Sequence, residues 1–190
     1  MLSLSYLSER IRSWAVARNI VDGATQKDQF IKLDSEFGEL CGNLGLIELN
    51  NECEDNEDMH RDLLEKLKDD IGDNYVVLTI LAAQQGAKIE EIDIIEGPAF
   101  GSAILHLGAA KGKLGDCILK GDGRGVMQYI GKCIYFLQRI CDDHDLEFNV
   151  CIAAAYADIK DRRGIMYHGA FIKSTDTRYE ACCAEIGVQP

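Results

Sequence analysis

Two pairs of acidic residues have the types and the spacing for metal chemistry. Glu36 and Glu39 stand three positions apart, and Asp70 and Asp73 repeat that spacing. Residues three apart share one side of a helix, so each pair presents two carboxylates together. Four clustered carboxylates repel one another, and a hard divalent cation with oxygen ligands relieves this repulsion. We therefore expect a Mg²⁺ (or Mn²⁺) site at these four residues. The alternative is that the acids form ordinary solvated helix faces.

Two antiparallel helices would have to bring these pairs together. Thr25 followed by Asp28 resembles a capping box and predicts the start of the first helix. Residues 48–58 are polar and acidic, which predicts a linker. The second helix is expected from about His60 to Gly86, and its second half, YVVLTILAA, is apolar all round and should be buried. The first helix carries a seam of apolar residues that alternates three and four positions: Phe30, Leu33, Phe37, Leu40 and Leu44.

Glycines beside the acid pairs are a further clue. Gly38 and Gly72 stand inside the expected helices, where glycine costs about 1 kcal/mol relative to alanine. We interpret them as points where another helix approaches closely.

The rest of the chain also reads as helices. Before these two helices, apolar residues on one face predict an N-terminal helix that ends at about Asn19. The dipeptide Gly97-Pro98 is expected to open another helix, which the sequence GDGRG at 121–125 interrupts before a fifth. A sixth helix is expected from about residue 148 to Gly164, and the remainder from Ile165 lacks periodicity and predicts an extended tail.

The chain contains an internal similarity. Residues 30–44 align with 104–118, and residues 71–85 align with 130–144, so that Leu33 meets Leu107 and Leu78 meets Leu137. The apolar positions persist, but the four acids are replaced by Ala110, Lys113, Tyr129 and Lys132. Chance likeness of two amphipathic hairpins is the alternative to a duplication.

The internal similarity suggests an architecture. Two hairpins packed about a pseudo-dyad make a four-helix bundle. We expect one all-α domain over residues 1–190, with flanking N- and C-terminal helices. Residues 30–86 would be the active hairpin, 98–144 the degenerate hairpin and 147–164 the closing helix.

Composition restricts the partners. A formal net charge of −12 gives no electrostatic reason to bind nucleic acid. No apolar run is long enough to span a membrane, and we expect no membrane partner. The eight cysteines contain no C-x-x-C pair. We expect that no signal peptide precedes them, because the amphipathic start of the sequence has no long apolar region. We therefore expect a cytoplasmic protein with free thiols.

Several segments of the sequence resemble a known family. The string QFIKLDSEFGEL (29–40), followed by KDDIGDNYVVLTILAAQQG (68–86), is similar to the paired acidic motif of MazG-like pyrophosphohydrolases. The opening IRSWAVARNIVDGAT (11–25) and the segment YADIKDRRGIMYHGAFIKS (156–174) resemble phage and bacterial members. The resemblance implies an all-α enzyme that hydrolyses a nucleoside triphosphate at the α–β bond, giving a monophosphate and pyrophosphate. It implies host cytoplasm if the protein is phage-encoded.

The resemblance also implies roles for individual residues. The two acid pairs would be the metal ligands, and Lys32 would act in catalysis beside Glu36 and Glu39. Lys160, Arg162 and Arg163, with Lys32, would bind phosphates. Trp14 and Gln29 would meet the base, although Trp14 fits a core position equally well. Lys113, Tyr129 and Lys132 are either solvent-facing replacements or additional contacts to the substrate.

Three departures from the family pattern bear on these expectations. Ser35 stands where many relatives have a second Glu, so a water-activating role is not transferred to it. Asp70 replaces a longer Glu. Residues 94–145 look like an insertion and are similar to the inactive half of dimeric dUTPases.

The base preference is open, with dGTP or another purine deoxynucleotide as one hypothesis. A dUTPase-like hydrolase, a non-catalytic nucleotide sensor and a purely structural bundle are the alternative functions. We expect a homodimer or homotetramer.

Overall fold

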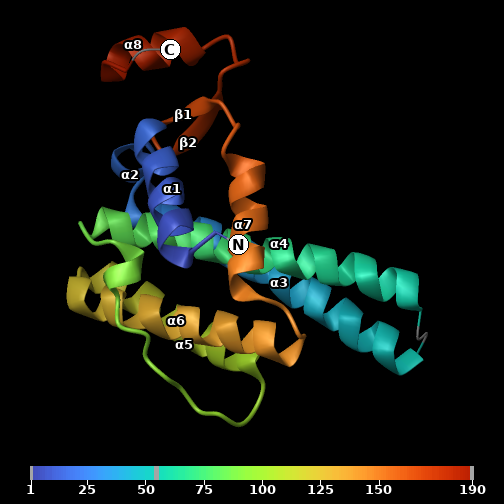
Figure 1. Cartoon of the computed structure of the whole chain (residues 1–190). Coiled ribbons are helices and arrows are strands. Elements are labelled where there is room, and N and C mark those ends of the chain that lie inside the picture. Colours follow the sequence, from blue (N-terminus) through green and yellow to red (C-terminus); the bar gives the residue numbers. More distant parts are fainter. Residues whose placement is uncertain (1, 54–55, 189–190) are drawn as a thin grey trace.

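The computed structural model describes residues 2–53 and 56–188 and has the expected all-α fold (Figure 1). A two-stranded antiparallel hairpin is its only sheet within those ranges. The elements in chain order are α1 Leu4–Ala17, α2 Ile20–Gly23, α3 Gln26–Cys53, α4 Glu57–Gln84, the 3-10 helix η1 Ile89–Glu91, α5 Ala103–Lys120, α6 Gly123–Asp143, α7 Phe148–Ile159, β1 Gly164–Tyr167, β2 Ala170–Lys173 and α8 Tyr179–Ile186.

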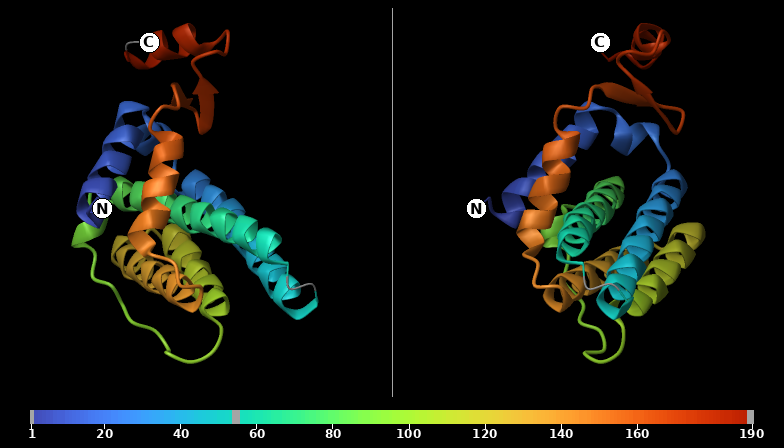
Figure 2. Two further views of the ribbon diagram at one scale, coloured as in Figure 1. Left: turned by 45° about the vertical axis from the view of Figure 1, so that its right-hand side comes forward. Right: turned by 90° about the vertical axis from the view of Figure 1, so that its right-hand side faces the viewer.

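Two helical hairpins form the centre of the molecule. α3 packs along α4 and α5 packs along α6, while α3 also contacts α5 and α4 contacts α6. This arrangement confirms the four-helix bundle. α1 and α7 flank it by packing against α4, and they lie on the side of α4 away from α5 (Figure 2). No helix in the described ranges has both the length and the hydrophobicity to cross a bilayer.

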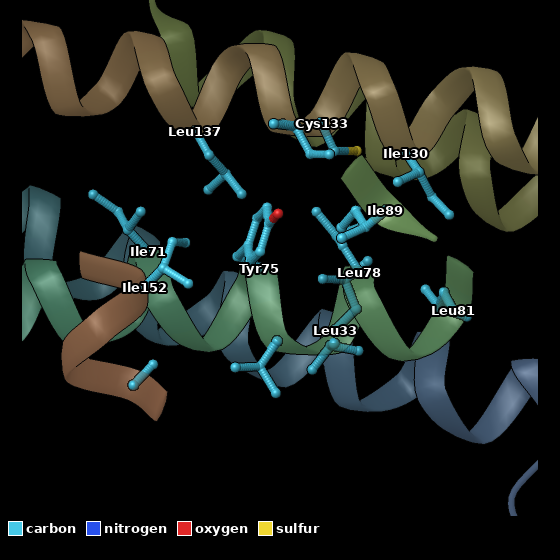
Figure 3. Packing of buried hydrophobic residues seen from close by; sticks show 14 of the residues in the cluster. Leu33, Ile71, Tyr75, Leu78, Leu81, Ile89, Ile130, Cys133, Leu137 and Ile152 are labelled. Carbon is cyan, nitrogen blue, oxygen red and sulfur yellow. The ribbon is translucent and has the colours of Figure 1, made fainter. Parts of the chain in front are cut away.

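The core lies between the two hairpins. Leu78 and Leu81 of α4 face Ile130 and Cys133 of α6 across this interface (Figure 3). Tyr75 is also buried, and its hydroxyl lies 2.8 Å from the Ser8 hydroxyl of α1. The apolar half of α4 is buried from Tyr75 to Ala82, as its composition predicts.

The matched leucines of the internal similarity all lie in this core. Leu33, Leu107, Leu78 and Leu137 are each buried. Their burial agrees with equivalent packing positions. The two-fold relation between the hairpins stays a prediction.

The α3–α4 hairpin differs from the expected one at its tip. The capping box is confirmed, because the Thr25 backbone N–H and hydroxyl donate to Asp28 at 2.8 and 2.7 Å. The linker expected over 48–58 is wrong for residues 48–53, which continue α3. Ile47 and Asn50 are buried there, so packing extends the helix despite its polar composition. Residues 54–55 lie outside the described ranges. α4 begins at Glu57, since the Asn56 side chain caps it by accepting from Met59 N at 3.0 Å.

The segment between the hairpins also differs. The helix expected from Gly97-Pro98 begins only at Ala103, and the residues before it form a loop across α6. A side chain at Gly97 would overlap the Phe136 ring, and one at Gly131 would overlap the Asp93 carbonyl oxygen. Close packing of this loop against α6 therefore takes the place of the expected first turn.

The extended tail expected from Ile165 is wrong. β1 and β2 pair with Ile165 opposite Ile172 and Tyr167 opposite Ala170, and α8 follows. The closing helix ends at Ile159, before its expected end at Gly164. His168 and Gly169 form the two-residue turn with φ of 46° and 78°. Such turns require positive φ at both positions and are common in hairpins. The His-Gly pair was the available signal for this turn.

The two helical glycines have different surroundings. A Cβ at Gly72 would lie 2.5 Å from the Cys151 carbonyl oxygen and 2.6 Å from Ala155 Cβ, so α7 does approach α4 closely there. A Cβ at Gly38 would have no neighbour within 4 Å. The expectation of close approach is therefore confirmed at Gly72 and wrong within this chain at Gly38.

Candidate active site

A cavity of about 680 Å³ lies where α3 and α4 meet α1 and the β-hairpin. Its volume is within the range of small-molecule sites. It brings together residues from both ends of the sequence. The sequence-predicted residues that line it are Trp14, Gln29, Lys32, Glu36, Asp73, Arg162 and Arg163.

The acidic side of the cavity is formed by α3 and α4. Glu36 is buried, with 4% of its surface exposed, and Asp73 is half-buried across from it. The pKa of Asp73 is raised to about 7, mainly by burial and then by the nearby charges of Glu36 and Asp69. The Lys32 ammonium forms an ion pair with Glu36 one turn away on α3.

The other two predicted ligands lie beside the cavity. Asp70 is buried, and the Asn43 side chain donates to its carboxylate at 2.7 Å. Burial raises the pKa of Asp70 to about 6, and the charges of Asp69, Glu39 and Glu36 act in the same direction while Asn43 opposes them. Glu39 is exposed. Glu36 therefore lies close enough to act on both Asp70 and Asp73, and Glu39 acts on Asp70. Of the four predicted ligands, only Glu36 and Asp73 line the cavity.

Asp69 also belongs to this cluster, although it was not predicted as a site residue. Its pKa is raised by partial burial and then by Asp158 of α7, with Glu36 and Glu39 contributing. Asp69 and Asp73 are four positions apart, so they share a helix face. The spacing of Asp69 and Asp73 is the sequence signal that indicates this additional carboxylate.

The chemistry of the acidic cluster fits a hard cation. Its donors are all carboxylate oxygens. Burial raises the pKa values of Asp69, Asp70 and Asp73, and the charges of neighbouring carboxylates raise them further. In the described part of the chain, no three His, Cys, Asp or Glu side chains converge as a ready-made metal site. Glu36 and Asp73 are the acids best placed to hold a cation in the cavity. Asp70 is already held by Asn43, so its role as a direct ligand stays a prediction.

Basic residues form another wall. Arg162 and Arg163 follow α7, and Lys173 lies on β2. Arg18 of the α1 end holds this turn, since its Nε donates to the Arg162 carbonyl oxygen at 2.6 Å. Lys160 is exposed at the end of α7 and does not line the cavity. The predicted phosphate-binding set is thus brought together apart from Lys160.

The remaining wall is apolar and aromatic. Trp14, Met166 and Phe171 line it, and the Trp14 indole N–H is buried without a hydrogen-bond partner among the described residues. The Arg18 guanidinium lies 5.1 Å from the Trp14 ring centroid. Gln29 is 5% exposed and lines the same cavity. Trp14 thus belongs to a cavity wall rather than to a closed core.

Backbone hydrogen bonds fix the β-hairpin over the cavity. Met166 N donates to the Arg18 carbonyl oxygen at 2.8 Å, and Gly169 N donates to the Gly23 carbonyl oxygen at 3.1 Å. The Asn19 side chain donates to the Met166 carbonyl oxygen at 2.9 Å. The hairpin therefore contributes Met166, Phe171 and Lys173 as a fixed wall. None of these three was predicted as a site residue.

The second hairpin contributes no side chain to the cavity lining within the described ranges. Ala110 is buried in the bundle, and Lys113 is exposed with Asp116 at 3.9 Å. Tyr129 and Lys132 are half-buried. Their positions favour the interpretation that these residues are ordinary replacements rather than contacts to a substrate.

Comparison with known proteins gives one short match. The chain is 38% identical over 84 residues to an uncharacterized 18.2 kDa protein of the rep-hol intergenic region of Haemophilus phage HP1. The match covers 44% of this chain and 42% of that protein, so the chain spans less than half of the relative's length. No protein-family model and no solved structure matches the chain. The similarity to MazG-like enzymes therefore rests on the sequence motifs described above.

Proposed function

We propose that this protein is a metal-dependent hydrolase that cleaves a nucleoside triphosphate at the α–β bond, releasing a monophosphate and pyrophosphate. The observation that carries the proposal is the composition of one cavity. Acidic residues Glu36 and Asp73, basic residues Arg162 and Arg163, and the aromatic ring of Trp14 all line it. A nucleotide needs these three chemical environments at once, for its metal-bound phosphates, its remaining negative charge and its base.

The basic residues would bind and orient the phosphates. Arg162 and Arg163 present planar guanidinium groups that suit phosphate oxygens. Lys32, on the opposite wall, would exchange its contact with Glu36 for a phosphate oxygen when substrate enters. Positive groups placed where negative charge develops stabilise the transition state. In this proposal these residues share the charge that builds up on the leaving pyrophosphate.

The acidic residues would hold the cation and receive a proton. Mg²⁺ or Mn²⁺ bound at Glu36 and Asp73, with Glu39 and Asp70 beside them, would supply neutralisation of the triphosphate and a more acidic water. A carboxylate of the cluster would take the proton of the attacking water. Asp69 now belongs with the candidates for that role, because it lies within the same group of mutually interacting acids.

The apolar wall would contact the base. Trp14 and Phe171 offer ring faces for stacking, and Gln29 offers an amide for hydrogen bonding to a base edge. A purine deoxynucleotide such as dGTP is the first substrate to test.

Under this proposal the protein acts in the cytoplasm, where nucleoside triphosphates are found. If the protein is phage-encoded, this is the cytoplasm of the host.

The test is a screen of the common NTPs and dNTPs with Mg²⁺ or Mn²⁺ and identification of both products. From dGTP we expect dGMP and pyrophosphate. Release of dGDP and inorganic phosphate would mean attack at the γ position and would refute the proposed reaction. Tight binding without turnover would instead support a nucleotide sensor.

Variants connect the reaction to this cavity. Asp73→Asn and Glu36→Gln preserve shape and remove one charge each, and turnover should fall by about 100-fold or more. Asp62→Asn is the matched control, because Asp62 is an exposed carboxylate on α4 outside the cavity. Equal activity of wild type, Asp73→Asn and Glu36→Gln would remove the assignment of the site.

A further inference from the structure

A continuous line of uncharged residues runs along the outer face of α3. At about 100° per residue this line lies opposite the buried seam of Leu33 and Leu40. Every member is exposed, with Ile31 68% and Leu49 52% exposed at its two ends. We call it the outer stripe, and it consists of Ile31, Ser35, Gly38, Gly42, Gly45 and Leu49.

The glycines of the outer stripe have no packing role within the chain. A Cβ at Gly38, Gly42 or Gly45 would find no atom within 4 Å. Glycine inside a helix weakens it, so three open glycines on one helix face are costly in the monomer. They allow another helix backbone to approach closely, because the separation of packed helices depends on the side chains between them.

The neighbouring helix α5 adds exposed apolar side chains beside the outer stripe. α5 lies beside α3, where Lys111 forms an ion pair with Asp34 and lies 4.4 Å from the Phe37 ring centroid. The outer face of α5 exposes Leu105 (74%) and Leu119 (69%). No other described element covers the outer face of α3, because α1 and α7 lie on the far side of the bundle (Figure 2).

The order of residues identifies the partner. The outer stripe is palindromic about the position of Leu40, with a large apolar residue at each end and small residues between them. Two copies crossing antiparallel at that position would place Ile31 against Leu49 and Gly38 against Gly42 of the second copy. A two-fold interface uses the same surface on both subunits, and this pattern is self-complementary in that way.

Charge at the ends of the stripe agrees with the same pairing. Lys27 lies one turn before Ile31, and Glu52 lies one turn after Leu49, both exposed. Antiparallel pairing brings Lys27 of each copy near Glu52 of the other. The six stripe positions carry no charge, in a chain with net charge −12. Opposite charges at the rim and an uncharged centre favour this register over a parallel one.

We propose that two copies of this chain dimerise through the outer stripe, with their α3 helices antiparallel and crossing at Gly38 and Gly42. This inference is independent of the proposed function. The residues of the stripe do not line the cavity, so both cavities stay open in the dimer.

The first test measures mass in solution. Sedimentation of the wild type over a dilution series, up to the order of 100 μM, should show a dimer. Gly38→Trp should raise the dimer dissociation constant by at least about 30-fold, with an unchanged circular dichroism spectrum since the space around Gly38 is open. Ala154→Trp, at an exposed small residue of α7 on the opposite side, is the matched control and should leave the dimer intact. A monomeric wild type, or a Gly38→Trp variant that dimerises normally, would overturn the proposal.

The second test measures register. A mixture of Gly38→Cys chains with Gly42→Cys chains, each carrying Cys41→Ser, should form a disulfide-linked dimer on mild oxidation, whereas either alone should not. Cross-linking of each variant with itself would indicate parallel pairing and contradict the proposed geometry. Lys27→Glu alone should weaken the dimer several-fold, and adding Glu52→Lys should restore it.

Discussion

The packing of α7 on α4 makes a sharp prediction about Gly72. An alanine there gains helix propensity worth up to about 1 kcal/mol. Its methyl group would lie 2.5 Å from the Cys151 carbonyl oxygen and 2.6 Å from Ala155 Cβ. The first of these is backbone and cannot turn aside, so α7 has to shift. Overpacking of this kind typically costs about 1–3 kcal/mol. After subtraction of a propensity gain of about 1 kcal/mol, we expect Gly72→Ala to lower the free energy of unfolding by up to about 2 kcal/mol.

Gly112→Ala is the matched control. Gly112 also lies within a helix, but a Cβ there would have no neighbour within 4 Å. The same substitution should therefore raise the free energy of unfolding by up to about 1 kcal/mol. Urea unfolding followed by circular dichroism at 222 nm measures the free energy of unfolding of both variants. In thermal unfolding, a change of 1 kcal/mol would shift the Tm by roughly 2–4 °C for a chain of this size.

The difference in the free energy of unfolding between Gly72→Ala and Gly112→Ala tests the close packing of α7 on α4. A Gly72→Ala variant as stable as Gly112→Ala would show that α7 does not press against α4 as described. The shift of α7 expected in Gly72→Ala can also be measured at the cavity, because α7 leads directly into Arg162 and Arg163. Gly72→Ala should weaken nucleotide binding, whereas Gly112→Ala should leave it unchanged.

Three further predictions concern the cavity and the core. Arg162→Ala should lower kcat/KM by about 10²–10³-fold through lost charge stabilisation, with little change in Tm because the side chain is exposed, and a similar kcat/KM would argue against its role. Nucleotide binding should change the fluorescence of Trp14, the only tryptophan, and a constant signal at saturation would place the base elsewhere. Tyr75→Phe should cost about 1 kcal/mol in urea unfolding by removing the hydrogen bond to Ser8, and an unchanged free energy of unfolding would mean that this bond contributes nothing.

The helical part of the fold follows largely from sequence periodicity. The seam through Leu33 and Leu40 and the apolar half of α4 predicted which faces are buried, and the capping box at Thr25 predicted a helix start. The limits of α3 did not follow, because burial of Ile47 and Asn50 overrides a polar local composition. Tertiary packing, unlike periodicity, depends on residues that are distant in the chain.

Only the helical part of the candidate site could be predicted, because periodicity places residues on helices but does not predict contacts between distant segments. Glu36 and Asp73 belong to regular helices, so their spacing indicated where they would lie. Met166 and Phe171 reach the cavity only because a short β-hairpin is hydrogen-bonded to the segment after α1. Strands of four residues give little periodic signal, so the sequence predicts only an extended tail where this wall lies.

The hydrogen bonds between this hairpin and the segment after α1 also determine when the cavity can form during synthesis. Met166 and Gly169 bond to Arg18 and Gly23, which leave the ribosome much earlier. A nascent chain that ends at α7 contains all four bundle helices and can bury their core, since domains fold as their sequence becomes available. It still lacks one wall of the cavity. Assembly of the bundle and appearance of the site are therefore separate events in the life of each chain, and the site comes second.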